Sequence, residues 1–129
     1  MFKKFKNWKE AFKQNNKGHA FLWNLAEAEV LIRRAVELDP TDANHHRGLG
    51  ACLSLQGRYA EAEASHRKAI ELDPTDADYQ WGLGSCLSLQ GKLAKAETCY
   101  RKAIKLDPTE EYYKMLLNEC LKAQDKPTE

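Results

Sequence analysis

The sequence predicts an all-α fold made of helical hairpins that stack one after another. The first observation is a period, since Pro40, Pro74 and Pro108 follow one another at equal intervals along the chain. The second is a repeated segment, which reads GLGACLSLQG over residues 48–57 and GLGSCLSLQG over residues 82–91. The third is composition, because helix-forming alanine, leucine, glutamate, lysine and arginine dominate each unit. A fixed period of this size indicates stacked supersecondary units.

Length and charge narrow the classes of protein further. A chain of 129 residues is enough for one compact domain or a short repeat array. It has no apolar run of the roughly 18 residues that a membrane helix needs, and no apolar core that would make its basic start a secretory signal. The net charge of +1 argues against nucleic-acid binding by the molecule as a whole. We therefore expect a cytoplasmic protein.

The N-terminal segment MFKKFKNWKEAF differs from the rest of the chain. Residues 1–23 hold six lysines and one glutamate, whereas the remainder carries more acidic than basic residues. We predict a short helix near residues 2–14, within a basic amphipathic cap over residues 1–18. One face of this helix would be aromatic, formed by Phe2, Phe5, Trp8 and Phe12. Covering the end of the helix array is the favoured role, and docking on an anionic membrane surface is the alternative.

The next segment, residues 19–42, is an irregular first repeat. A break at Asn15-Asn16-Lys17-Gly18 predicts an extended helix that starts near His19 and ends before Pro40. Where later copies have a Gln-Gly turn, this one has Leu22-Trp23-Asn24.

Residues 43–76 form the first full unit. Asp42 is placed to cap a helix whose apolar positions are Leu49, Cys52, Leu53 and Leu55. Gly57 then permits a turn, and a second helix from about Tyr59 to Leu72 is expected to bury Ala62, His66, Ala69 and Ile70.

Residues 77–110 repeat the plan of the first full unit. Residues 111–124 predict a capping helix whose polar outer face carries Lys114, Glu119 and Lys122, since a helix array needs such an end. Residues 125–129 are expected to be a disordered tail.

These units resemble the tetratricopeptide repeat, whose pattern is W-x2-L-G-x2-Y, then A-x3-F, then P, within one period. The first full unit offers His46-x2-Leu49-Gly50-x2-Leu53, Ala62-x3-His66 and Pro74, and the second offers Gln80-x2-Leu83-Gly84-x2-Leu87, Ala96-x3-Tyr100 and Pro108. The resemblance covers residues 24–124. It implies a short right-handed α-α superhelix of about three hairpins plus the capping helix, with a concave groove that binds a peptide or a partner helix.

The resemblance also implies which residues line the groove. They come from the first helix of each unit and from the capping helix, and the candidates are Asn44, Arg47, Gly48, Ser54, Asp78, Trp81, Gly82, Ser85, Ser88, Tyr112 and Met115. Trp81 ranks first as a binding hot spot, with packing on a neighbouring helix as the alternative. Because Gly48 and Gly82 lack side chains, we expect an open notch beside Arg47 and Trp81.

Some members of this family hold a C-terminal carboxylate in a clamp of lysines, asparagines and an arginine. The matching positions in this sequence are Lys13, Lys17, Gly48, Asp78 and Gly82. Only Lys13 fits this set, and Asp78 would repel the ligand, so we expect no such clamp.

No residue pattern indicates catalysis. The glycines follow no predicted strand and precede no GKS or GKT, so they do not form a phosphate loop. Three cysteines, Cys52, Cys86 and Cys120, recur with the same period as the prolines. This spacing is not that of metal ligands. It favours thiols that are packed between helices. We expect no metal, no cofactor and no enzyme activity.

The favoured function is a noncatalytic interaction module with a protein or peptide ligand and no nucleic-acid partner. Three alternatives remain open. The first is a peripheral membrane adaptor acting through the basic N-terminal helix. The second is a repeat domain or subunit of a larger enzyme, or of a secretion-chaperone system, whose members the GLGAC stretch resembles. The third, self-association through the ends of the array, is compatible with the others.

Overall fold

The computed structural model describes the backbone of residues 17–129 and the side chains from Asn24 onward. The predicted helix near residues 2–14, with Phe2, Phe5, Trp8 and Phe12, lies outside the described residues. Within them the chain forms six helices and no strand: α2 (Lys17–Leu38), α3 (Ala43–Leu55), α4 (Tyr59–Leu72), α5 (Ala77–Leu89), α6 (Leu93–Leu106) and α7 (Glu111–Ala123).

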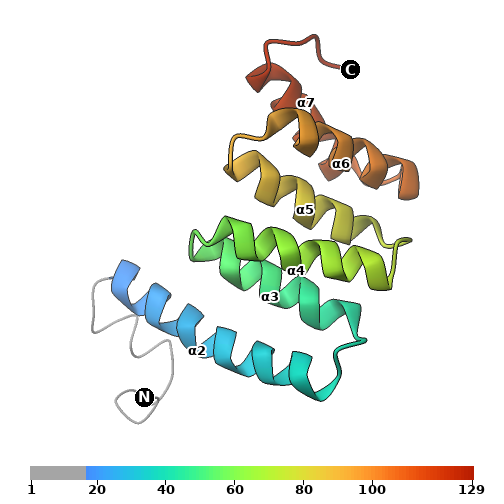
Figure 1. Ribbon diagram of the computed structural model, residues 1–129. Helices are drawn as coiled ribbons and strands as arrows, with labels where there is room; N and C mark the ends of the chain where they lie inside the picture. Colours follow the sequence, from blue (N-terminus) through green and yellow to red (C-terminus); the bar gives the residue numbers. More distant parts are fainter. Residues whose placement is uncertain (1–16) are drawn as a thin grey trace.

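The helices stack in chain order from α2 at one end to α7 at the other (Figure 1). Each helix contacts the next one along the chain, and α3 also contacts α5. The pairs α3 with α4 and α5 with α6 are therefore successive hairpins, and α7 begins a further unit without a second helix. This arrangement confirms the predicted all-α array.

The helix ends follow from the residues predicted to cap and break them. The Asp42 side chain accepts a hydrogen bond from the Asn44 amide at 2.9 Å, and Asp76 does the same for Asp78 one unit later. These bonds satisfy amides that a helix start leaves unpaired. Gly57 has a φ of 78°, in the left-handed region that favours glycine, and so has its counterpart in the next turn.

The core lies between the helices and consists of leucine, alanine, cysteine and tyrosine. Small side chains let the paired helices approach, and Ala62 and Ala96 are fully buried. The largest fully buried side chains are Leu53, Leu87 and Leu121, one in each of α3, α5 and α7. Leu55 corrects one prediction, because its side chain is 59% exposed and does not join the core.

Three thiols join successive units. The Sγ atoms of Cys52, Cys86 and Cys120 donate hydrogen bonds to the backbone carbonyls of Leu25, Tyr59 and Leu93 at 3.2–3.3 Å. All four cysteines of the chain are free and buried, in agreement with the packing role predicted for Cys52, Cys86 and Cys120. Burial raises the pKa of each of these three thiols, so they stay protonated and donate.

Carboxylates reinforce the same junctions. Glu97 accepts hydrogen bonds at 3.0 Å from Arg101, Gln124 and Lys126, and these bonds lower its pKa to about 2. Glu29 is held in the same way by Arg33, Gln56 and Arg58. At the middle junction Gln90 bonds to the Cys86 carbonyl, and Glu63 pairs with Lys92 at 3.7 Å rather than with the glutamine. We call the three sets the inter-repeat staples: Cys52 with Gln56 and Glu29, Cys86 with Gln90 and Glu63, and Cys120 with Gln124 and Glu97.

The C-terminal residues 125–129, for which a disordered tail is the prediction, lie against α6 and α7 in the structure. The Glu129 carboxylate accepts two hydrogen bonds from the Arg101 guanidinium, and the Glu129 amide donates to Asn118 Oδ1 at 3.0 Å. Opposite charges at the tail and on α6 account for this placement.

Candidate peptide-binding face

Helix geometry puts the predicted groove residues on one side of α3, α5 and α7. At 100° per residue, Asn44, Arg47 and Ala51 share a face opposite the buried Leu49 and Leu53. The same spacing applies to α5 and α7. We call this surface the α3–α5–α7 face, formed by the predicted groove residues together with Ala51, Leu55, Leu89 and Glu119.

Large apolar side chains are exposed along this face. Leu55 and Leu89, at equivalent places in α3 and α5, are 59% and 61% exposed. On α7, Tyr112 and Met115 are 45% and 47% exposed. Exposed apolar side chains gathered on one face of several helices are typical of a surface that binds another protein.

Two predicted groove residues also bond to the following unit. The Tyr79 hydroxyl donates to Asn44 Oδ1 at 3.0 Å, and the Tyr113 hydroxyl donates to Asp78 Oδ1. Burial, helped by the Asp78 carboxylate, raises the pKa of Tyr113, so this hydroxyl remains a donor. Asn44 and Asp78 therefore fix the spacing of the helices beneath the face while their exposed sides remain on it.

Trp81 is half-buried, and its ring packs edge-on against Tyr112 of α7 with centroids 5.8 Å apart. It also packs against the core around Ala77 and Ile104. Its indole Nε1 is buried and has no hydrogen-bond partner among the described residues. These contacts correspond to the packing alternative given for Trp81, and Trp81 links α5 to α7 under the exposed Tyr112.

The expected notch is present at one glycine and filled at the other. A Cβ added to Gly48 would meet nothing within 4 Å. A Cβ added to Gly82 would lie 2.8 Å from the His66 ring, which also reaches Gly50. The prediction of an open notch at Gly82 is therefore wrong, because the histidine of the preceding helix occupies the space.

The remaining candidates on the face differ in exposure. Arg47 and Ser88 are half-exposed. Ser85 is partly buried, and its Oγ is 3.5 Å from the hydroxyl of Tyr100. The Ser54 hydroxyl oxygen is buried with no hydrogen-bond partner among the described residues.

Sequence reasoning misses Leu55 and Leu89 as surface residues. Because leucine is apolar, the sequence analysis assigns Leu55 to the core. It makes no prediction for Leu89. The signal is nevertheless present, since residue 55 is at nearly the same angle on the helix as Asn44 and Ala51.

Two other kinds of site have no counterpart among residues 17–129. No cluster of three or more histidine, cysteine, aspartate or glutamate side chains in that range is arranged to hold a metal ion. None of the six described helices is both long and apolar enough to cross a membrane.

Comparisons with known proteins agree with this geometry. Family models described as tetratricopeptide repeat match residues 24–77 and 53–120. No curated protein matches the chain. Among solved structures, the first tetratricopeptide domain of Spaghetti (RPAP3), bound to the HSP90 peptide SRMEEVD, is similar with a TM-score of 0.76 at 17% identity, over 93% of this chain and 97% of that one.

An O-GlcNAc transferase mutant of Thermobaculum terrenum is similar with a TM-score of 0.70 at 22% identity. The match covers 84% of this chain and 23% of the transferase. Both likenesses concern the fold. Together with the family models, they show that the chain belongs to the tetratricopeptide repeat family, whose repeats generally serve as protein-interaction modules.

Proposed function

We propose that the protein is a noncatalytic interaction module that binds a peptide or a partner helix on the α3–α5–α7 face. The observation that carries this proposal is the exposure of apolar side chains on this face, with Leu55 and Leu89 at the ends of α3 and α5 and Met115 near the start of α7. Burying such side chains against a partner is worth roughly 25 cal/mol per Å² of apolar surface before the costs of association.

Two hydrogen bonds also connect the helices that form this face. The Tyr79–Asn44 and Tyr113–Asp78 hydrogen bonds fix α3, α5 and α7 relative to one another. A preformed surface spares the partner the cost of ordering it, which favours a binding role.

The cysteine thiols, which are the candidate nucleophiles, are packed between helices. The thiols of Cys52, Cys86 and Cys120 donate to backbone carbonyls, and burial raises their pKa, which disfavours the reactive thiolate. These observations support a noncatalytic role. Free, protonated thiols also support our proposal of a reducing, cytoplasmic setting.

The ligand we propose differs from that of the first structural neighbour. That domain is bound to an HSP90 peptide. In this chain the positions matching a carboxylate clamp include Gly48, Asp78 and Gly82, which offer no cation to a terminal carboxylate. We propose instead a ligand that presents apolar side chains to Leu55 and Leu89. The membrane adaptor through Phe2, Phe5, Trp8 and Phe12, a larger enzyme or secretion-chaperone system, and self-association stay predictions.

The test uses peptides selected from a display library for binding to the wild-type protein. The double variant Leu55→Glu with Leu89→Glu puts charge on the face and is expected to weaken binding by at least about tenfold. Leu38→Glu is the matched control, because Leu38 is 81% exposed at the end of α2 and lies off the face. Circular dichroism checks that each variant keeps its helices. Selected peptides that bind the folded double variant as well as the wild type would refute the proposal.

A further inference from the structure

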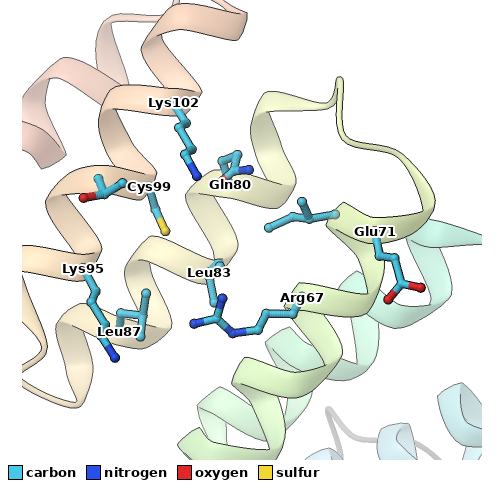
Figure 2. Close-up of a pocket in the computed structure, with 10 residues that line it drawn as sticks. Arg67, Glu71, Gln80, Leu83, Leu87, Lys95, Cys99 and Lys102 are labelled. Atoms are coloured by element: carbon cyan, nitrogen blue, oxygen red, sulfur yellow. The ribbon is translucent and has the colours of Figure 1, made fainter.

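A second hollow lies on the opposite side of α5 from the α3–α5–α7 face. It has a volume of about 410 Å³ and is bounded by α4 and α6, with α5 between them (Figure 2). Its lining from α5 consists of Gln80, Leu83 and Leu87, which are half a helical turn away from Trp81 and Ser85. We call it the α4–α6 pocket, and a ligand in it would not touch the α3–α5–α7 face.

The inner wall of the pocket is apolar except for one polar side chain, Gln80, which forms no hydrogen bond with the described residues. Leu83, Leu87 and the Cys99 thiol line this wall and are 1–7% exposed. Gln80 is only 8% exposed, and its side-chain amide forms no hydrogen bond within residues 17–129. In the preceding unit the equivalent His46 bonds to the Pro40 carbonyl at 2.8 Å. The Gln80 amide, which lines the open pocket, is thus free to bond a ligand.

Cations surround the opening. Figure 2 shows Arg67 extending from α4 toward the pocket, with Lys95 and Lys102 on α6. Within the described part of the chain, neither lysine forms an ion pair, and the nearest carboxylate to Arg67 is Glu63 of its own helix at 3.8 Å. The pocket lining also contains one acid, Glu71, whose carboxylate forms an exposed ion pair with Lys68 at 3.4 Å.

The preceding unit has an ion pair between helices that the α4–α6 pocket lacks. There, Arg33 of α2 pairs with Glu61 of α4 at 3.5 Å, so an ion pair bridges the two helices. One unit later Arg67 stands where Arg33 stood and Lys95 where Glu61 stood. Two cations now face each other, and an anion between them would supply the charge that Glu61 supplies in the first copy.

We propose that the α4–α6 pocket binds an acidic segment of a partner protein, with an apolar side chain against Leu83 and Leu87 and a carboxylate between Arg67 and Lys95. Lys102 adds to the positive field, and the Gln80 amide bonds the backbone of the segment. Opposite charge selects the acidic partner, while burial of the apolar side chain supplies most of the affinity.

The probe is a fluorescein-labelled octapeptide in which leucine and glutamate alternate. Two comparison peptides replace every glutamate by lysine or every leucine by serine. Anisotropy should show saturable binding of the leucine–glutamate peptide that weakens with added salt, at least about tenfold weaker binding of the serine peptide, and none of the lysine peptide.

Lys95→Glu is the decisive variant, because it restores the charge pattern of the Arg33–Glu61 pair. It is expected to weaken binding of the leucine–glutamate peptide by at least about tenfold. Gln80→Leu, which removes the free amide at similar volume, should weaken it by about threefold or more. Lys105→Glu is the control, since it makes the same change of charge on an exposed part of α6 outside the pocket.

Three results would overturn the proposal. The first is no saturable binding of the leucine–glutamate peptide by the wild-type protein, and the second is equal weakening by Lys95→Glu and Lys105→Glu. The third is weakening by the Leu55→Glu, Leu89→Glu double variant but not by Lys95→Glu. That pattern would place the peptide on the α3–α5–α7 face, which supports the proposed function and refutes this second site.

Discussion

His66 and Tyr100 hold the same position in successive hairpins, yet their surroundings differ. The His66 ring lies between α3 and α5 and would meet an added Cβ at either Gly50 or Gly82 at 2.8 Å. The Tyr100 ring lies against Gly84, and its hydroxyl reaches Ser85 Oγ at 3.5 Å. The comparison shows that the residue between two helices decides how much space the facing glycines leave.

The two rings also differ in charge chemistry. His66 is 3% exposed, and its Nδ1 has no hydrogen-bond partner within the described residues. Burial, with a smaller contribution from the Arg47 charge, lowers the pKa of His66 to about 4. Tyr100 stays neutral throughout the physiological range, because burial raises its pKa above the ordinary value of 10.0. At this position one hairpin therefore carries an acid-sensitive ring and the other does not.

The largest expected effect is acid destabilisation through His66. Its pKa is lower in the folded chain than the ordinary value of 6.5, so the unfolded chain binds the proton first. Its contribution to stability is complete above pH 6.5 and is lost as the pH falls toward 4. The shift corresponds to about 3 kcal/mol.

The measurement is urea unfolding of the wild type and of His66→Phe, the residue of the family pattern, near pH 7 and near pH 4. Glu29 and Glu97, whose pKa values are lowered, add acid sensitivity to both proteins. The fall in unfolding free energy between pH 7 and pH 4 is compared for the two proteins, and the difference is the contribution of His66. An equal fall in both proteins would show that His66 does not titrate as its burial requires.

A smaller effect separates the two glycines at the equivalent positions 48 and 82. Gly82→Ala should destabilise the protein by about 1 kcal/mol, because the clash with His66 outweighs the gain in helix propensity. Gly48→Ala should stabilise it by about 0.5–1 kcal/mol, because its new methyl group meets open space. Thermal unfolding of both variants tests the opposite signs, and a stabilised Gly82→Ala would mean that the His66 ring can move aside.

The smallest effect is expected at Tyr100. The hydrogen bond from its hydroxyl to Ser85 is long, so Tyr100→Phe should cost about 0.5 kcal/mol. Acid sensitivity should remain that of the wild type. Urea unfolding at the same two pH values checks both points. A loss larger than an ordinary neutral hydrogen bond contributes would show that the hydroxyl matters more than its geometry indicates.

The sequence was informative wherever a property depends on residues close together in the chain. Asp42 caps α3 and Gly57 turns the chain as predicted, because caps and turns are local. The array of hairpins followed from the period. The space at Gly82 could not be predicted in this way, because it depends on which side chain another helix sends toward it.

The tail and the candidate site show the same limit. The contact of Glu129 with Arg101 joins residues 28 positions apart. The repeat pattern of the sequence does not predict this contact. The positive charge of the α4–α6 pocket depends on Lys95, which is at the position equivalent to Glu61 in the preceding unit. A search for similarity between the units does not detect such a difference. The groove residues implied by the family resemblance remain predictions for the binding experiments.

The inter-repeat staples have a consequence for how such a chain can change its length. Each staple joins one unit to the next through residues that recur at the same places in the repeat period. A duplicated copy of residues 43–76 would therefore carry its own thiol, glutamine and glutamate in register with both neighbours. The array can grow by whole units without redesign of any junction, whereas a helix insertion of another length between a thiol and its carbonyl would put that one junction out of register.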